Sequence, residues 1–359
     1  IYVGYRYFET FAKDRVRFPF GFGMSYTSFD ITASDFKLDG NKVTGSVNVK
    51  NTGSTPGREV VQIYCSAPQG KLGKPARVLC GFDKTPGESQ TLSFEIPLES
   101  VASYEDSGVT GHKSAWILEQ GGYVFYAGAD VRSASEAYSL TLPETVVRQC
   151  KSALGPLTAF KRMVNSNGKP EFEDVPLTGE AFPHDHAKLP AEIPQTGDRG
   201  IRLADVVNGK NTLEEFTAQL TDYDLSCIIC GEGMGSPKVT AGTAAAFGGV
   251  SDTLTALGIP CACCDDGPSG MRLDCGTKAF SLPNGTLLAS TFDRPLMTEL
   301  FTFMGLEMHT NQVDCLLGPG MNIHRHPLNG RNFEYFSEDP YLTGEMASAE
   351  LAGLHSTGA

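Results

Sequence analysis

The chain has 359 residues, of which 40% are hydrophobic and 20% are charged, so it is long enough for two or three domains with ordinary cores. Its formal net charge of -13, from 42 acidic and 29 basic side chains, disfavours nucleic acid and membrane partners, because it repels phosphate backbones and anionic lipid. Its apolar runs stay well short of the roughly 20 residues that a membrane-spanning helix needs.

The first 28 residues are rich in aromatic side chains and glycine. Residues 18–26 read FPFGFGMSY, and Gly21 and Gly23 indicate tight backbone bends that let the flanking rings pack. We interpret residues 1–28 as the end of a domain that packs on its neighbour. The pattern is already under way at Ile1, and the last residues, LHSTGA, show no helix end, so we expect both termini to be cuts within a longer protein.

Residues 29–142 change to a two-residue periodicity, which is typical of strands. Residues 43–49 (VTGSVNV) alternate, an Asn-Thr-Gly turn follows, and similar short runs recur up to residue 142 between Gly, Pro, Asn and Asp turns. About seven strands of this kind predict an all-β sandwich. We find no cluster of acid, base and nucleophile in this stretch of sequence, and we interpret it as a structural module.

Residues 143–200 are polar and rich in proline. They predict a surface connector with one short helix near residues 150–163. His184 and His186 fall in this connector, and the sequence around them offers no cluster of thiols or carboxylates. We therefore expect both imidazoles to be solvated rather than bound to a metal.

Helices and strands alternate after residue 201. Residues 212–220 begin with a capping box, from Thr212 to Glu215, and carry apolar residues at helical spacing. Buried strands are predicted at residues 258–264 and 313–317, and further helices at residues 293–311 and 340–355. Strands that alternate with helices are typical of a parallel α/β fold, either an open sheet or a barrel.

Two polar loops follow the two predicted strands of this region. Residues 265–272 (DDGPSGMR) come directly after the first strand, and residues 318–340 come after the second. In parallel α/β folds, functional groups gather on loops at the carboxyl ends of strands. Carboxylates accept hydrogen bonds from hydroxyl groups and arginine forks donate them, so both loops suit a neutral, hydroxyl-rich ligand. Ion pairs that only brace the loops are the alternative interpretation for either loop taken alone.

Other patterns are weak signals for a metal, a redox centre or a nucleotide. Cys227 and Cys230 form a lone CxxC, His324 and His326 supply only two imidazoles, and residues 230–236 (CGEGMGS) lack the ending of a phosphate-binding loop. We therefore predict no cofactor and no metal. The ten cysteines show no disulfide framework, and reduced, mostly buried thiols predict a reducing compartment, the cytoplasm.

Several motifs, in order along the chain, resemble those of glycoside hydrolase family 3. Residues 266–272 (DGPSGMR), 282–291 (LPNGTLLAST), 316–325 (LLGPGMNIHR) and 330–340 (GRNFEYFSEDP) look like consecutive motifs of the family's barrel domain. Residues 18–26 look like the end of its α/β sandwich domain, and residues 51–64 (NTGSTPGREVVQIY) look like its fibronectin type III-like domain. The resemblance covers nearly the whole chain.

The resemblance implies a multidomain fold. Residues 1–28 would be the C-terminal end of an α/β sandwich domain, residues 29–142 a fibronectin type III-like β-sandwich, residues 143–200 a connector, and residues 201–359 the N-terminal part of a (β/α)8 TIM-type barrel. Most members of the family place the barrel first, so this order resembles a reversed subset of bacterial β-glucosidases. The family's nucleophile, an aspartate late in the barrel, and its acid/base glutamate, in the α/β sandwich domain, would both lie outside this chain. We therefore predict no catalytic residue within it.

By the same resemblance, Asp266, Arg272 and Arg331 would bind the substrate. Asp266 would accept hydrogen bonds from hydroxyls of a terminal glucose, and the two arginines would complete the grip, with Arg331 held by acids such as Glu334 or Glu338. The complete enzyme would be a retaining β-glucosidase that releases glucose from the non-reducing end of short β-glucosides such as cello-oligosaccharides.

Two alternatives to this activity stay open. One is a β-xylosidase of the same family, and the other is a non-catalytic fragment that binds carbohydrate or serves a structural role. A small carbohydrate is the expected partner, and the remainder of the same enzyme would be needed for activity. The sequence leaves open whether the protein forms a homo-oligomer.

Overall fold

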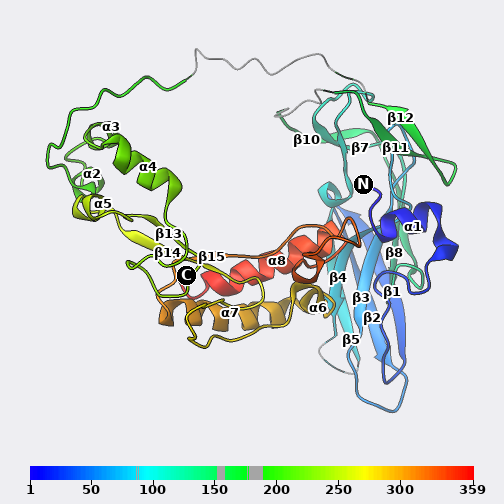
Figure 1. Ribbon diagram of the computed structural model, residues 1–359. Coiled ribbons are helices and arrows are strands. Elements are labelled where there is room, and N and C mark those ends of the chain that lie inside the picture. Colours follow the sequence, from blue (N-terminus) through cyan, green and yellow to red (C-terminus); the bar gives the residue numbers. More distant parts are fainter. Residues whose placement is uncertain (86, 88, 152–157, 176, 178–188) are drawn as a thin grey trace.

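A β-rich part and a mainly helical part make up the protein in a computed structural model, which describes residues 1–85, 87, 89–151, 158–175, 177 and 189–359 (Figure 1). The N-terminal helix α1 (Tyr5–Phe11) lies against the β-rich part. Residues 189–200 contain neither helix nor strand and lead into the helical part at its far end.

Two antiparallel sheets form a sandwich in the β-rich part, with the orders β1-β2-β5 and β4-β3-β8-β9. The strands are β1 (Phe29–Asp39), β2 (Lys42–Asn51), β3 (Val60–Ser66), β4 (Val78–Lys84), β5 (Ser89–Pro97), β8 (Gly121–Gly128) and β9 (Ser135–Leu142). Val43, Val47 and Val49 lie on one face of β2 and are fully buried, in the same core as Ile63 and Phe125 of the other sheet. The predicted all-β sandwich is confirmed.

Two further β elements add to this part. β6 (Ser103–Glu105), β7 (Ala115–Leu118) and β10 (Thr145–Gln149) form a third sheet, and β11 (Lys161–Ser166) pairs with β12 (Lys169–Asp174) as a hairpin. Asn167 and Gly168 both have positive φ, as a two-residue hairpin turn requires. The helix predicted near residues 150–163 is wrong at residues 161–163, which begin β11, while residues 152–157, His184 and His186 lie outside the described residues.

A three-stranded sheet with the order β13-β14-β15 organises the helical part. The elements are α2 (Leu203–Val207), α3 (Leu213–Ala218), α4 (Asp222–Cys230), β13 (Ala245–Gly248), α5 (Asp252–Ala256), β14 (Cys261–Asp266), α6 (Gly285–Ala289), α7 (Arg294–Thr310), β15 (Cys315–Leu317) and α8 (Pro340–His355). β14 and β15 are parallel, as predicted, and α7 connects them. β13 runs antiparallel to β14, contrary to the expected all-parallel layout, because the link between them holds only a five-residue helix, too short to cross the sheet.

Side-chain caps fix where the helices begin. Thr212 accepts a hydrogen bond from the backbone N–H of Glu215 at the start of α3, so the predicted capping box is confirmed. Asp293 and Asp339 cap α7 and α8 in the same way, and each of these helices has a proline in its first turn. Helix α8 therefore begins where the second polar loop ends.

The sandwich and the helical part share one hydrophobic core. The ring of Phe82 in β4 packs edge-on against Phe292, with centroids 5.3 Å apart, and the same cluster contains Leu342 of α8. At its edge, the Lys84 ammonium donates a 3.1 Å hydrogen bond to the carbonyl of Thr291. The sandwich is thus packed against the start of α8 and the residues just before α7.

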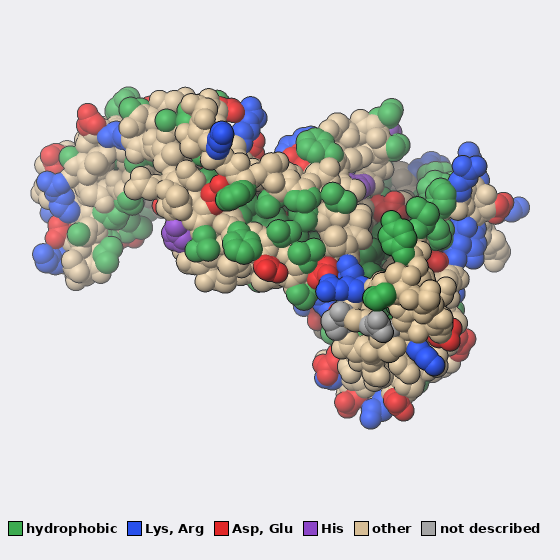
Figure 2. Space-filling model, turned by 90° about the horizontal axis from the view of Figure 1, so that it is seen from below, with side chains coloured by type: hydrophobic (Ala, Val, Ile, Leu, Met, Phe, Trp, Pro, Cys, Tyr) green, Lys and Arg blue, Asp and Glu red, His purple; other side chains and the backbone are tan. Residues whose placement is uncertain are grey.

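Helix α7 is apolar on two sides. Met297, Phe301 and Met304 are buried, whereas Phe303 and Leu306 are more than half exposed. Hydrophobic side chains gather across the middle of the face that Figure 2 shows, which is the side of the molecule on which α7 lies in Figure 1. A helix with two apolar sides is suited to lie between two layers.

Candidate functional site

The first polar loop folds back on itself directly after β14. The backbone N–H of Arg272 donates a 2.9 Å hydrogen bond to the carbonyl of Asp266, and Gly270 closes a turn on Gly267 at 3.2 Å. Gly270 has a φ of 111°, and a Cβ there would overlap the carbonyl of Phe280, so glycine is needed to make this turn. The turn brings the side chain of Arg272 back beside that of Asp266.

Asp266 keeps an accessible carboxylate within this loop. Its side chain is 45% exposed, and Nη1 of Arg272 approaches its Oδ2 only to 4.0 Å. Arg272 makes its closer contacts with Asp274, whose carboxylate oxygens lie 3.1 Å from Nε and from Nη2. Asp266 is therefore restrained in direction by a nearby positive charge while its oxygens can accept hydrogen bonds from a ligand.

The second loop carries Arg331, whose side chain is held by neighbours in the same loop. Nε of Arg331 donates a short hydrogen bond to Glu334, whose side chain is largely buried, and the guanidinium lies 5.8 Å from the ring centroid of Tyr335. The bond to Glu334 and the charge of its carboxylate raise the pKa of Arg331, with a smaller contribution from the charge of Asp266. Glu334 and Tyr335 therefore hold the guanidinium from within the same loop.

Backbone contacts from α6 hold the second loop in this shape. The hydroxyl of Thr286 lies within hydrogen-bond distance of the carbonyls of Asn332, Phe333 and Tyr335, the closest at 2.8 Å. Of the two acids expected to hold Arg331, Glu334 does so, whereas Glu338 accepts a hydrogen bond from the backbone N–H of Tyr5. The structure places Arg272 beside Asp266 and Arg331 on Glu334, and Glu338 belongs to a different contact.

Asp265 is a buried acid beside Asp266 that the sequence did not single out. Its side chain is fully buried beside Asp266, and neither carboxylate oxygen makes a hydrogen bond of ordinary geometry within the described residues. Burial raises the pKa of Asp265 to about 6, although the nearby backbone N–H groups of Asp266 and Arg272 lower it in part. The sequence does place Asp265 and Asp266 side by side at the strand end, but burial of the first could not be read from it.

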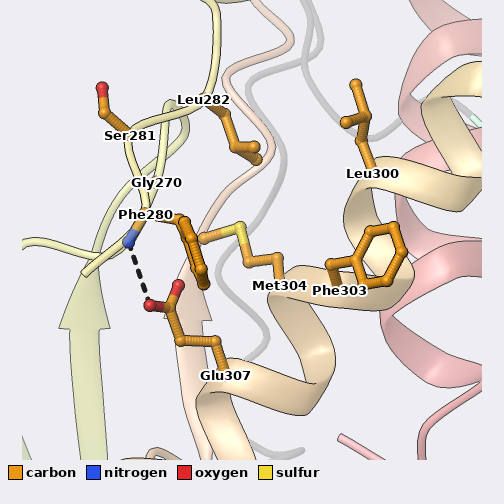
Figure 3. A pocket seen from close by; sticks show the side chains of 8 residues that line it. All are labelled: Gly270, Phe280, Ser281, Leu282, Leu300, Phe303, Met304 and Glu307. Carbon is orange, nitrogen blue, oxygen red and sulfur yellow. Dashed lines mark hydrogen bonds between the residues drawn. The ribbon is translucent and has the colours of Figure 1, made fainter.

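The cavity in Figure 3 lies behind the first loop and is apolar. Phe280, Leu282, Phe303 and Met304 line it together with Gly270, and the backbone N–H of Phe280 donates a 2.9 Å hydrogen bond to Glu307 of α7. Its volume is about 240 Å³. Such a lining offers little to hydroxyl groups, and the Phe280–Glu307 contact ties the loop to α7.

The histidines and cysteines with suggestive spacing have separate roles. His324 Nε2 lies 3.0 Å from the carbonyl of Tyr335, and His326 Nδ1 accepts from the backbone N–H of Leu328. Across the ranges that the structure describes, no three His, Cys, Asp or Glu side chains are arranged to hold a metal ion. All ten cysteines have free thiols, but only four are buried, so the expectation of mostly buried thiols is wrong. The helices within the same ranges are all too short or too polar to cross a bilayer.

Comparison with known proteins matches the β-rich part and the helical part to two known domains. Residues 59–131 match the fibronectin type III-like domain, and residues 197–359 match the glycosyl hydrolase family 3 N terminal domain. The chain is 63% identical over its full length to a beta-glucosidase of Ruminococcus albus, of which it covers 38%. It is 39% identical over 99% of its length to beta-glucosidase A of Butyrivibrio fibrisolvens, of which it covers 48%.

A solved structure supports the same similarity to beta-glucosidases. The chain superposes on the crystal structure of a beta-glucosidase from Paenibacillus barengoltzii with a TM-score of 0.91 and 51% identity, covering 100% of this chain and 41% of that chain. The chain thus spans less than half the length of each of these relatives.

Proposed function

We infer that the intact protein is a retaining exo-β-glucosidase. The inference starts from the order of the matched domains, a fibronectin type III-like domain followed by the N-terminal domain of glycosyl hydrolase family 3. The enzyme releases glucose from the non-reducing end of short β-glucosides such as cello-oligosaccharides. The accessible carboxylate of Asp266 beside Arg272, together with the exposed guanidinium of Arg331, carries this proposal, because such groups suit the hydroxyls of a neutral sugar ring. The relatives that are named beta-glucosidases support it.

In this proposal the three residues bind and do not cleave. Asp266 accepts hydrogen bonds from two hydroxyls of the terminal glucose, and the guanidinium groups of Arg272 and Arg331 donate to hydroxyl oxygens. The nucleophile and the acid/base carboxyl lie outside residues 1–359 and, in a retaining enzyme, stand about 5–5.5 Å apart. Contacts to hydroxyls away from the scissile bond assist because they can strengthen as the ring flattens toward the transition state. The ten free thiols support a reducing compartment, the cytoplasm.

Nitrophenyl glycosides test the proposal directly. The intact protein should hydrolyse nitrophenyl β-glucoside with a kcat/KM at least about tenfold above that for nitrophenyl β-xyloside, since the glucoside carries one more hydroxymethyl group to hold. The reverse order would make it a β-xylosidase. Sugar binding without hydrolysis of either substrate would leave a carbohydrate-binding protein. Residues 1–359 alone should be inactive, and activity of that piece would overturn the placement of both carboxylates outside it.

A further inference from the structure

Two thiols lie side by side on neighbouring strands of the sheet that carries Asp266. Cys264 of β14 and Cys315 of β15 are partners in the parallel register of these strands, so their side chains project from the same face of the sheet. The thiol of Cys315 is also a hydrogen-bond partner of the Cys264 thiol. Two sulfur atoms therefore face the same small volume.

This thiol pair lies directly beneath Asp266. Cys264 and Asp266 are two residues apart in β14, so both side chains project from one face, about 6–7 Å apart along the strand. Cys263, on the opposite face, belongs to the same hydrophobic cluster as Met304 and Met308 of α7. The two thiols therefore lie on the side of the sheet that faces away from α7 and presents Asp266.

The pair offers two soft ligands to a metal ion. Within the described part of the chain, no third His, Cys, Asp or Glu side chain joins the two thiols, so the donor set is too small for a tetrahedral zinc site. Thiolate sulfur selects soft cations over hard ones. Among the soft cations, mercury(II), silver(I) and copper(I) are satisfied by two sulfur ligands in line.

Charge balance favours the divalent ion of these three. Burial raises the pKa of the Cys264 thiol to about 11, and the charge of Cys315 adds to that rise, so an ion has to displace the proton to bind. Mercury(II) that replaces both thiol protons leaves a neutral unit. Silver(I) or copper(I) would leave a net negative charge in a buried place beneath the Asp266 carboxylate, which is costly.

We propose that Cys264 and Cys315 form a two-thiolate site for mercury(II), and that an ion bound there disables the candidate sugar site from below. Each sulfur forms a bond to the ion as its proton leaves to solvent, and no electrons are transferred. The ion is larger than the protons it replaces, so it strains the strand pair directly beneath Asp266. It acts as an inhibitor and not as a cofactor. The site itself is independent of the proposed function, and only its effect on turnover rests on that function.

Retention of mercury by the intact protein tests this inference. Reduced protein is mixed with mercury(II) chloride and desalted in an excess of N-acetylcysteine, and the bound mercury is measured by mass spectrometry. The monothiol removes mercury from single cysteines, whereas two thiolates fixed side by side hold it as a chelate. Cys264→Ser and Cys315→Ser should each retain about one mercury ion fewer per chain than the wild type. Cys315→Ser decides the question if Cys264→Ser fails to fold, since Cys315 is only partly buried.

Two other cysteines supply the matched controls. Cys275 is an exposed single thiol, and Cys227 belongs to the closely spaced pair with Cys230 in α4. Cys275→Ser and Cys227→Ser should both retain as much mercury as the wild type. Equal retention by the wild type and both strand variants, or a loss that follows Cys227→Ser instead, would overturn the inference.

Turnover of nitrophenyl β-glucoside is the second readout. Under the same conditions, mercury should lower kcat/KM of the wild type at least about tenfold and leave that of Cys315→Ser within about twofold. Retention of the ion with unchanged turnover would overturn its effect on the sugar site. A wild type without glucosidase activity would remove the proposed function, while the retention measurement would still decide whether the metal site exists.

Discussion

The hydroxyl of Tyr5 donates a 2.8 Å hydrogen bond to Oδ2 of Asp339, which lies 334 residues further along the chain. The same hydroxyl accepts a 2.9 Å bond from the backbone N–H of Leu79 in β4, and Oδ1 of Asp339 caps α8 through Leu342 at 2.7 Å. One buried ring therefore joins the N-terminal segment, the sandwich and the end of the loop that carries Arg331.

Removal of the Tyr5 hydroxyl should weaken this junction. Tyr5→Phe leaves a buried carboxylate oxygen and a buried N–H without their partner, so the free energy of unfolding should fall by about 1–3 kcal/mol. Burial raises the pKa of Asp339 to about 6, and the Tyr5 hydrogen bond opposes that rise, so the loss should be larger at pH 8, where Asp339 is charged, than at pH 5. Denaturant unfolding at the two pH values measures both effects. Tyr7→Phe, in the same helix, is the control, and an equal loss in the two variants would contradict the role of the hydroxyl.

The two central residues of the candidate site should be needed for turnover and not for folding. Asp266→Asn removes a charged acceptor, and Arg331→Lys removes a planar fork, so each should lower kcat/KM for nitrophenyl β-glucoside about 10- to 100-fold in the intact protein. Arg325→Lys is the matched control, because Arg325 is an exposed arginine of the same loop. Thermal unfolding should stay near that of the wild type. Unchanged kinetics in Asp266→Asn would take Asp266 out of the site.

The buried carboxyl group of Glu350 should make the stability of the folded protein depend on pH. It is almost fully buried in α8, its Oε1 has no hydrogen-bond partner among the described residues, and burial raises its pKa from 4.5 to about 8. The folded protein therefore holds this proton more tightly than the unfolded chain, so its contribution to stability falls as the pH rises from about 4.5 to about 8.

Glu350→Gln should remove that loss, because glutamine stays neutral. The variant should unfold with nearly wild-type free energy at pH 5 and be more stable than the wild type by about 1–3 kcal/mol at pH 8. Glu299→Gln, at an exposed position of α7, should leave the pH profile unchanged. Parallel profiles for the wild type and Glu350→Gln would show that Glu350 is charged without cost in the folded state.

Local patterns allowed much of the fold to be predicted. Strand periodicity predicted the sandwich, and the capping box at Thr212 predicted the start of α3, because both signals lie within a few residues. The hairpin of β11 and β12 was missed although Asn167-Gly168 is a strong turn signal, since the flanking residues are polar. β13 was missed because four residues of Ala-Ala-Phe-Gly give no strand pattern.

Part of the candidate site could be predicted, because that part also depends on residues close together in the sequence. Asp266 and Arg272 follow a buried strand, so their placement at its end could be inferred from the sequence alone. The hydrogen bond from Tyr5 to Asp339 could not be inferred, because nothing local to either residue indicates a partner that lies 334 residues away in the sequence. A cavity of about 560 Å³ is lined by Phe22, Arg58 and His324, which lie far apart in the sequence. Only the folded chain brings them together, so this cavity could not be predicted either.

Gly285 should be needed for the position of Arg331. It is the first residue of α6, and a Cβ there would overlap the carbonyl of Glu334, the residue that holds the Arg331 guanidinium. Because the obstacle is backbone, Gly285→Ala must push residues 334–335 away, which should lower kcat/KM at least about fivefold and stability by about 1–3 kcal/mol. Gly344→Ala is the matched control, since open space surrounds that position in α8. It should keep wild-type kinetics and gain about 0.5–1 kcal/mol, as alanine does in a helix. Kinetics on nitrophenyl β-glucoside and denaturant unfolding measure both variants. Wild-type kinetics in Gly285→Ala would show that the second loop can shift without weakening its binding of the sugar.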